Sequence, residues 1–194
     1  MPIEFEDHPF WDFSLTVYGA EGVAPACIAL QERCGVDVNV LLFCVWIGAS
    51  GRGTLSSADL AAAVEAVATW NREVVCGLRT VRRWMKDART GVARDLSEAL
   101  RRQIVDIEVA CEHAEQLALG RAVLRAAPAS PAGADRQADD AVANCALYLK
   151  RLGAAPTEAD HSDLATILVA AVPAVDRPAF VAKIVQAVVG AAAR

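Results

Sequence analysis

A basic and aromatic cluster within residues 76–89 holds the side chains whose types and spacing could most readily do chemistry. At about 100° per residue, its members spread over roughly a third of a helix circumference. Arginine binds carboxylates and phosphates and stacks on aromatic rings, so the cluster predicts a face that binds an anionic or acidic partner. The partner-binding residues would be Arg79, Arg82, Arg83, Trp84, Lys86 and Arg89.

The next helical stretch offers these cations an internal alternative, because it carries Glu108, Glu112 and Glu115 at helical spacing. If the two helices lie antiparallel, the carboxylates could pair with Arg79, Arg83 and Lys86. We expect such pairing to be partial and to leave Arg82 and Arg89 free for a partner.

A second candidate set lies in the first forty residues. Asp37 is placed to cap a helix, and Asn39 follows in the first turn, where it could bond a neighbouring loop or a ligand. Trp11 and Tyr18 are spaced for one face of a helix, and they could belong to the core or line the mouth of a pocket. We therefore predict Trp11, Tyr18 and Asn39 as ligand or loop contacts.

Catalytic and metal-binding patterns are absent from the sequence. The six cysteines are scattered without a CxxC pair and are typical of small buried side chains in a reducing compartment. Glu112 directly precedes His113, which is not the Glu-x-x-His spacing of di-iron bundles. The glycine-rich loop at 48–53 lacks the Lys-Ser/Thr ending of a phosphate loop. The sequence thus predicts no catalytic residue, no metal and no cofactor.

Composition narrows the function classes further. The 194 residues carry a net charge of -5, so the chain lacks the overall positive field that non-specific nucleic-acid binding needs. The apolar run 40–49 is half the roughly 20 residues that a bilayer span requires, which predicts no transmembrane segment. The acidic first residues do not form the positive region of a signal peptide. We expect a cytoplasmic protein that does not bind nucleic acid.

Start and stop signals predict three short helices between Pro9 and Gly48. Pro9 suits the first position of a helix, and Gly35 suits the left-handed position that ends one. Asp37 would cap the third helix. Because residues 40–47 are apolar on every side, that helix should be central and surrounded by others.

Two long helices follow, with the spacing of an antiparallel hairpin. Ser56 and Asp59 form the pattern of a capping box. An apolar stripe from Leu60 to Met85 predicts either one helix or two with a bend around Trp70 and Asn71. A second stripe between 95 and 126 predicts the partner helix.

The stretch 127–135 has the only linker-like composition, because its prolines and glycines do not continue a helix. We therefore predict a helical core domain at 8–126, a linker at 127–135 and a C-terminal helical segment at 136–194, packed on the core. Asp176 should cap the last helix. With no strand alternation in the sequence, the predicted fold is all-α, a multi-helix bundle with a long antiparallel helical hairpin.

Five runs resemble one bacterial family. They are Phe10-Trp11-x-Phe13-Ser14-Leu15, Val23-x-x-Ala26-Cys27-x-x-Leu30-Gln31, Gly35-x-Asp37-Val38-Asn39-x-Leu41-Leu42, Trp70-x-x-x-Val74-Val75 and Leu78-Arg79-x-Val81-Arg82-Arg83. The order and spacing of these runs are similar to those of conserved hypothetical proteins of unknown function. The resemblance covers about Pro9 to Ala118. It implies a cytoplasmic bacterial protein and supplies no activity, substrate or catalytic residue.

The leading hypothesis is a non-enzymatic cytoplasmic interaction module or adaptor that binds a protein partner through the basic and aromatic face. The alternative is a small-molecule or lipid-binding helical protein, because apolar content is high and Trp11 and Tyr18 could line a pocket. An enzyme of unrecognised type is the third hypothesis. The pattern identifies neither the partner nor an oligomeric state.

Overall fold

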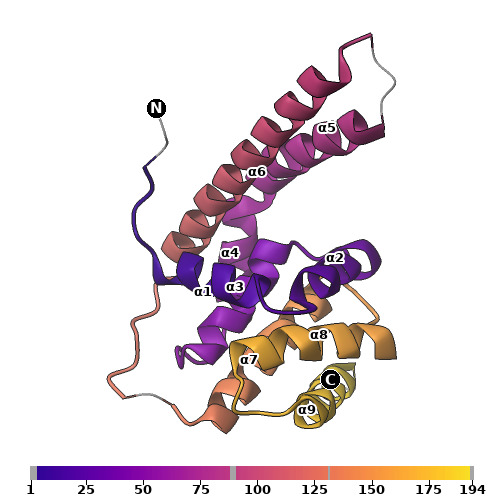
Figure 1. The fold of residues 1–194 in the computed structure, drawn as a ribbon. Coiled ribbons are helices and arrows are strands. Elements are labelled where there is room, and N and C mark those ends of the chain that lie inside the picture. Colours follow the sequence, from indigo (N-terminus) through magenta and orange to yellow (C-terminus); the bar gives the residue numbers. More distant parts are fainter. Residues whose placement is uncertain (1–3, 88–90, 131, 193–194) are drawn as a thin grey trace.

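The protein is built of helices, as the sequence predicts. The computed structural model describes residues 4–87, 91–130 and 132–192, and these residues contain helices and loops without any strand (Figure 1). The elements in chain order are α1 (Pro9–Tyr18), α2 (Val23–Cys34), α3 (Val38–Ala49), α4 (Ser57–Trp70), the π-helix η1 (Asn71–Val75), α5 (Cys76–Asp87), α6 (Arg94–Ala122), α7 (Ala134–Arg151), α8 (Glu158–Ala171) and α9 (Arg177–Ala192).

Three of the helices begin or end at the capping residues that the sequence predicts. The carboxylate of Asp37 accepts from the backbone N–H of Asn39 at 2.9 Å. Ser56 and Asp59 form both halves of a capping box at the start of α4. Gly35 ends α2 with a φ of 69°, a left-handed conformation that a side chain would strain. These caps satisfy backbone groups that helix ends leave unpaired.

The core is centred on α3, which is buried from Asn39 to Gly48. Phe10 of α1 packs on Phe43 and Trp46 of α3, with ring centroids 5.4 and 5.2 Å apart. Helix α7 packs along the other side of α3, so closely that a Cβ on Gly48 would overlap the backbone of Ala141.

One buried side chain ties α7 to the loop before α4. The amide of Asn144 accepts from the N–H of Leu55 at 2.7 Å and donates to the carbonyls of Cys44 and Gly53, both at 3.2 Å. Helix α8 packs against α2, where Arg33 pairs with Asp160 at 2.7 Å. Residues on both sides of 127–135 therefore share one hydrophobic core.

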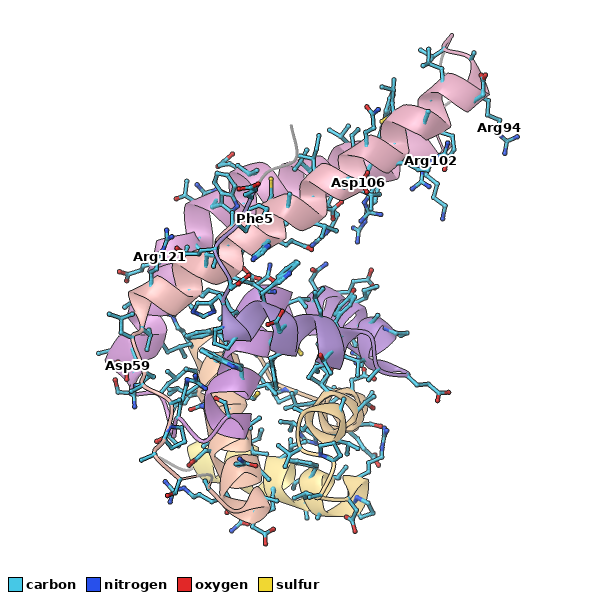
Figure 2. All side chains as sticks on the ribbon, turned by 60° about the vertical axis from the view of Figure 1, so that its left-hand side comes forward. Phe5, Asp59, Arg94, Arg102, Asp106 and Arg121 are labelled. Atoms are coloured by element: carbon cyan, nitrogen blue, oxygen red, sulfur yellow. The ribbon has the colours of Figure 1, made fainter. Side chains whose placement is uncertain are left out.

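An arm of two helices projects beyond this body. We use "arm" for η1, α5 and the part of α6 up to Glu112, and "body" for α1–α3 with α7–α9. Helix α5 packs along α6, which runs back in the opposite direction (Figure 1). The stripe from Leu60 to Met85 belongs to two α-helices, α4 and α5. They are joined by the π-helix Asn71–Val75, which begins where the sequence placed the alternative of a bend. Side chains of the arm face the body across a cleft (Figure 2).

No single described helix is long and apolar enough to cross a membrane. The bent pair α1 and α2, with 97° between the two axes, would reach the required length and composition together. Both helices contribute buried side chains to the core, among them Phe10 and Leu30.

Candidate binding cleft between the arm and the body

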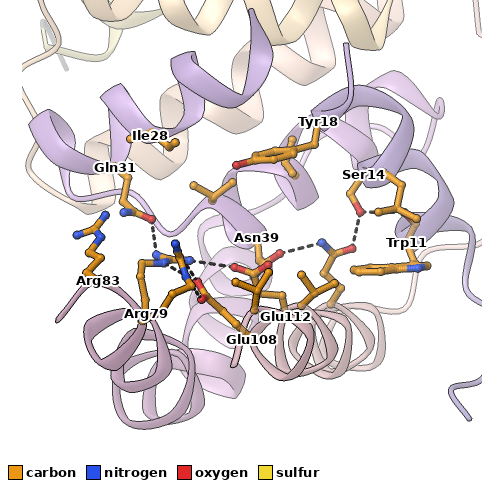
Figure 3. Close-up of a pocket in the computed structure, with 17 residues that line it drawn as sticks. Trp11, Ser14, Tyr18, Ile28, Gln31, Asn39, Arg79, Arg83, Glu108 and Glu112 are labelled. Carbon is orange, nitrogen blue, oxygen red and sulfur yellow. Dashed lines mark hydrogen bonds and ion pairs between the residues drawn. The ribbon is translucent and has the colours of Figure 1, made fainter. Parts of the chain in front are cut away.

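A cavity of about 370 Å³ lies between the arm and the body, and it brings the two predicted sets of residues together (Figure 3). Arg79 and Arg83 lie at one end and Trp11 and Ser14 at the other, with Tyr18 on the wall between them. The predicted residues that line this cavity are Trp11, Tyr18, Asn39, Arg79, Arg82 and Arg83.

Three members of the predicted basic face lie elsewhere. Trp84 is 63% exposed and does not line the cavity. Lys86 is also exposed and outside it. Arg89 lies outside the residues that the structure describes. The predicted face therefore lies only partly in the cleft, which Trp84 and Lys86 do not line.

Two of the arginines are held by carboxylates of α6. Arg79 donates to Glu108 at 3.2 Å and to Glu112 at 2.9 Å. Arg82 donates to both oxygens of Glu108, at 2.6 and 3.2 Å. The expectation that Arg82 stays free is therefore wrong, because Glu108 lies within reach of two neighbouring turns of α5. Arg79 also donates to Gln31 of α2 at 2.7 Å, which links the arm to the body.

The two carboxylates respond differently to this pairing. Burial would raise the pKa of Glu108, but the hydrogen bonds and charges of Arg82 and Arg79 outweigh it and lower the pKa. For Glu112, burial prevails and the pKa is raised despite Arg79. The arginines of α5 thus stabilise the ionised form of Glu108 more than that of Glu112.

Arg83 differs from its neighbours. Its side chain is exposed at the edge of the cavity, and it has no hydrogen bond or ion pair with any residue that the structure describes. The expected pairs of Arg83 and Lys86 with the glutamates of α6 do not form. Arg83 is the cation of this cleft that remains available to an anion.

The cavity walls are mostly apolar. Leu15, Ile28 and Val109 are large side chains that line it and stay exposed to solvent. Trp11 is held in place on its other side by His113, whose ring stacks on the indole at 4.0 Å. Burial raises the pKa of Tyr18. The arrangement suits a ligand that has an apolar part beside an acidic group.

A chain of buried polar side chains closes the floor. Ser14 donates to Gln116 at 2.6 Å, and Gln116 donates to Asn39 at 2.8 Å. Asn39 in turn donates to Glu115 at 3.1 Å. Asn39 therefore contacts helix α6, whereas the sequence predicted that it would contact a loop or a ligand. Gln116 was not predicted, since nothing in its helical spacing distinguishes it from a surface glutamine.

Glu115 is the second residue whose role differs from the expectation. It does not meet an arginine but accepts from Asn39 and, at 3.2 Å, from Asn71 in the π-helix. Its side chain is 1% exposed. Burial, together with the charge of Asp37 and a hydrogen bond with that carboxyl group, raises the pKa of Glu115 to about 9. The surroundings of Glu115 therefore favour the neutral form of its carboxyl group.

A second, more polar cavity of about 330 Å³ lies beside this pair, and Arg79 and Arg83 separate the two. Asp37, Asn71 and Cys76 line it. The thiol of Cys76 donates to Asn71 at 3.4 Å, so it is engaged in the same network. Among the described residues, no group of three or more His, Cys, Asp or Glu side chains is arranged to hold a metal ion.

Comparisons with known proteins agree with the resemblance seen in the sequence. No curated protein and no solved structure matches the chain. One family model, described as "Protein of unknown function (DUF2390)", matches residues 9–119, which include α1 to α5 and nearly all of α6. The matched region thus contains every residue that lines the larger cavity. The chain belongs to the family of proteins of unknown function DUF2390.

Proposed function

We propose that the protein is a non-enzymatic interaction module of the cytoplasm, which binds an acidic segment of a partner protein in the cleft between arm and body. The observation that carries this proposal is Arg83, an exposed cation at the edge of an apolar cavity. Arg79 and Arg82 are already neutralised by α6. A carboxylate from a partner would pair with Arg83, because guanidinium and carboxylate form strong charge-assisted hydrogen bonds.

The apolar walls support a segment with hydrophobic residues next to its acidic ones. Leu15, Ile28 and Val109 surround the cavity and are exposed in the isolated chain. Exposed apolar side chains gathered at one concave site are typical of interaction surfaces. Their burial would provide the affinity, and the ion pair with Arg83 the orientation.

A small carboxylate ligand is the second candidate, and the size of the cavity favours it. Small-molecule sites typically measure about 300–1,000 Å³, and the cavity of about 370 Å³ falls within that range. The ligand would place its carboxylate against Arg83 and its apolar part against Tyr18 and Leu15. This alternative shares the chemistry of the first and differs in the source of the carboxylate.

The test is an affinity capture from native cytoplasm, quantified by mass spectrometry, with the wild-type chain and two charge reversals. Arg83→Glu removes the available cation of the cleft. Lys86→Glu is the matched control, because Lys86 is exposed on the same helix and lies outside the cavity. Native mass spectrometry of the three freshly purified proteins detects a retained small molecule.

We expect a protein captured in stoichiometric amount by the wild type and by Lys86→Glu, and lost from Arg83→Glu with no change in thermal unfolding. A retained small molecule that is lost only from Arg83→Glu would favour the second candidate. Equal capture by all three proteins, without a bound small molecule, would contradict both.

A further inference from the structure

The smaller cavity, of about 330 Å³, lies where three helix ends meet. Gly35 follows the end of α2, Asp37 caps the start of α3, and Asn71 begins the π-helix η1. The volume falls within the range of about 300–1,000 Å³ that small-molecule sites occupy. Arg79 and Arg83 belong to the walls of both cavities, so the two cavities adjoin at these side chains.

Asp37 places a carboxylate on the wall of the smaller cavity. One of its oxygens accepts from the backbone N–H of Asn39 at 2.9 Å. The residue is half-buried, and it forms no ion pair with any residue that the structure describes. Among the described residues that line this cavity, it is the only one with a carboxylate. A carboxylate in this position attracts an ammonium group of a ligand, because opposite charges attract strongly where water is partly excluded.

Arg83 places the opposite charge on the wall of the same cavity. Its guanidinium is unpaired in the part of the chain that the structure describes, whereas that of Arg79 is held by Glu108 and Glu112. Arg83 and Asp37 line one cavity, yet no ion pair between them is formed in the described chain. One cation and one carboxylate of the smaller cavity are therefore each available to a ligand.

Tyr148 of α7 adds a buried hydrogen-bond donor to this wall. Its ring packs in the core, and the residue is 2% exposed. The hydroxyl oxygen accepts from the backbone N–H of Asp37 at 2.9 Å. A phenol also donates its own proton, and no group in the described chain accepts that proton. Because a buried donor without an acceptor costs free energy, an acceptor on a ligand would be stabilised here.

We infer that the smaller cavity binds the polar end of a ligand that carries both a carboxylate and a primary ammonium group. The ammonium pairs with Asp37, and the carboxylate accepts from Arg83 and from Tyr148. The apolar part of the ligand lies in the larger cavity, against Leu15 and Ile28. The proposed function already gives Arg83 a carboxylate, on which this inference rests, and Asp37 adds the ammonium. A free α-amino acid with a large apolar side chain has this chemistry, and so does an acidic residue at the amino terminus of a partner protein.

The first test compares ligands of the wild-type chain by isothermal titration calorimetry. L-Phenylalanine carries all three parts, hydrocinnamate lacks the ammonium and phenethylamine lacks the carboxylate; L-leucine is a second amino acid probe. We expect L-phenylalanine to bind at least about tenfold more tightly than either analogue, because each analogue loses hydrogen bonds to a charged group. A tetrapeptide that begins with glutamate and leucine, with its amino terminus free or acetylated, tests the protein source. Tighter binding of the free tetrapeptide than of L-phenylalanine assigns the site to a partner's amino terminus, and weaker binding assigns it to a free amino acid.

The second test assigns each ligand group to its residue. Asp37→Asn should weaken the binding of L-phenylalanine by at least about tenfold without weakening that of hydrocinnamate. Asparagine caps helices about as well as aspartate, so α3 should keep its start. Asp176→Asn is the matched control, since Asp176 accepts from the N–H of Ala179 at the start of α9 and lines neither cavity. Arg83→Gln and Tyr148→Phe should weaken both ligands. Circular dichroism melting establishes that each variant is folded.

Equal binding of L-phenylalanine and hydrocinnamate, both dependent on Arg83, would overturn the inference and leave the proposed function standing. Binding of L-phenylalanine that Asp37→Asn does not change would also overturn it, because the ammonium would then lie elsewhere. The inference fails as well if L-phenylalanine, L-leucine and the free tetrapeptide all fail to bind at millimolar concentration. The capture experiment with Arg83→Glu decides the proposed function separately.

Discussion

The side chain of Asn39, in the first turn of α3, donates to the carboxyl group of Glu115, in the second half of α6, at 3.1 Å beneath the cleft. Burial and the nearby charge of Asp37 raise the pKa of Glu115 and so favour its protonated form, since two negative charges close together repel. This carboxyl group accepts from Asn39 of the body and from Asn71 of the arm, and so it links the two.

The first prediction concerns the pH dependence of stability. The pKa of Glu115 is about 9 in the folded chain and about 4.3 in an unfolded chain. Between these values the folded state holds a proton that the unfolded state has released, so stability falls as pH rises. We expect a slope of up to about 1.4 kcal/mol per pH unit between pH 7 and 8.5, measured by urea unfolding.

Glu115→Gln should remove most of this slope, because the amide replaces the protonated acid without a charge. Glu98→Gln serves as control. Glu98 lies on the arm, and a hydrogen bond from Arg101 lowers its pKa. Glu98 is therefore ionised in both the folded and the unfolded chain in this pH range. An unchanged slope in Glu115→Gln would mean that Glu115 is ionised in the fold.

The second prediction concerns the central helix. Trp46 is 5% exposed and packs on Phe10 and Phe43. Trp46→Ala should cost about 3–5 kcal/mol of unfolding free energy, because it leaves a large cavity. Trp84→Ala, at an exposed tryptophan, should change stability by less than about 0.5 kcal/mol. A loss below about 1 kcal/mol for Trp46→Ala would contradict the central position of α3.

The third prediction concerns the ion pairs of the arm. Glu108 is buried and accepts from Arg79 and Arg82, so Glu108→Gln removes the carboxylate partner of Arg82 and leaves Arg79 with Glu112 alone. We expect a loss of roughly 1–3 kcal/mol in denaturant unfolding, the usual cost of leaving a buried polar group unsatisfied. Arg83→Gln, which breaks no ion pair in the described chain, should lie within about 0.5 kcal/mol of the wild type. Equal effects of the two changes would contradict the assigned pairing.

The fourth prediction concerns thiol reactivity. All six cysteines are free, and Cys27, Cys44 and Cys145 are buried. Burial raises the pKa of Cys27 and of Cys145 to about 12, so few thiolates form near neutral pH. With a thiol reagent such as DTNB at pH 7.5, these three should react only on unfolding. One fast-reacting cysteine in the native protein would point to a nucleophilic or redox role.

Local signals predicted most of the fold. The caps at Asp37 and Ser56 bond the neighbouring backbone, so their effect depends on residues only two or three positions away. Residues 40–47 are apolar on every side of the helix, and this pattern likewise identifies a central helix. Asp176 accepts from the N–H of Ala179 at 2.8 Å, as its position before the last helix predicts.

The site was less predictable because it depends on contacts between distant segments. The sequence groups Glu115 with Glu108 and Glu112, yet Glu115 meets Asn39 and Asn71. Helical spacing indicates which residues share a face, but not which neighbour that face meets. Asn144 has no signal of its own either, since it is an isolated amide in an apolar pattern. A π-helix leaves no mark in the hydrophobic stripe, which continues through it.

The π-helix Asn71–Val75 determines which side of α5 faces the body. A π-turn holds about one residue more than an α-turn, and each residue turns a helix by about 100°. Deletion of one residue within this segment would restore a regular α-helix and rotate α5 by that angle. Arg79 and Arg82 would then leave Glu108, and a different side of α5 would face the body. The number of residues in this short π-helix thus decides which side chains of α5 line the binding cleft.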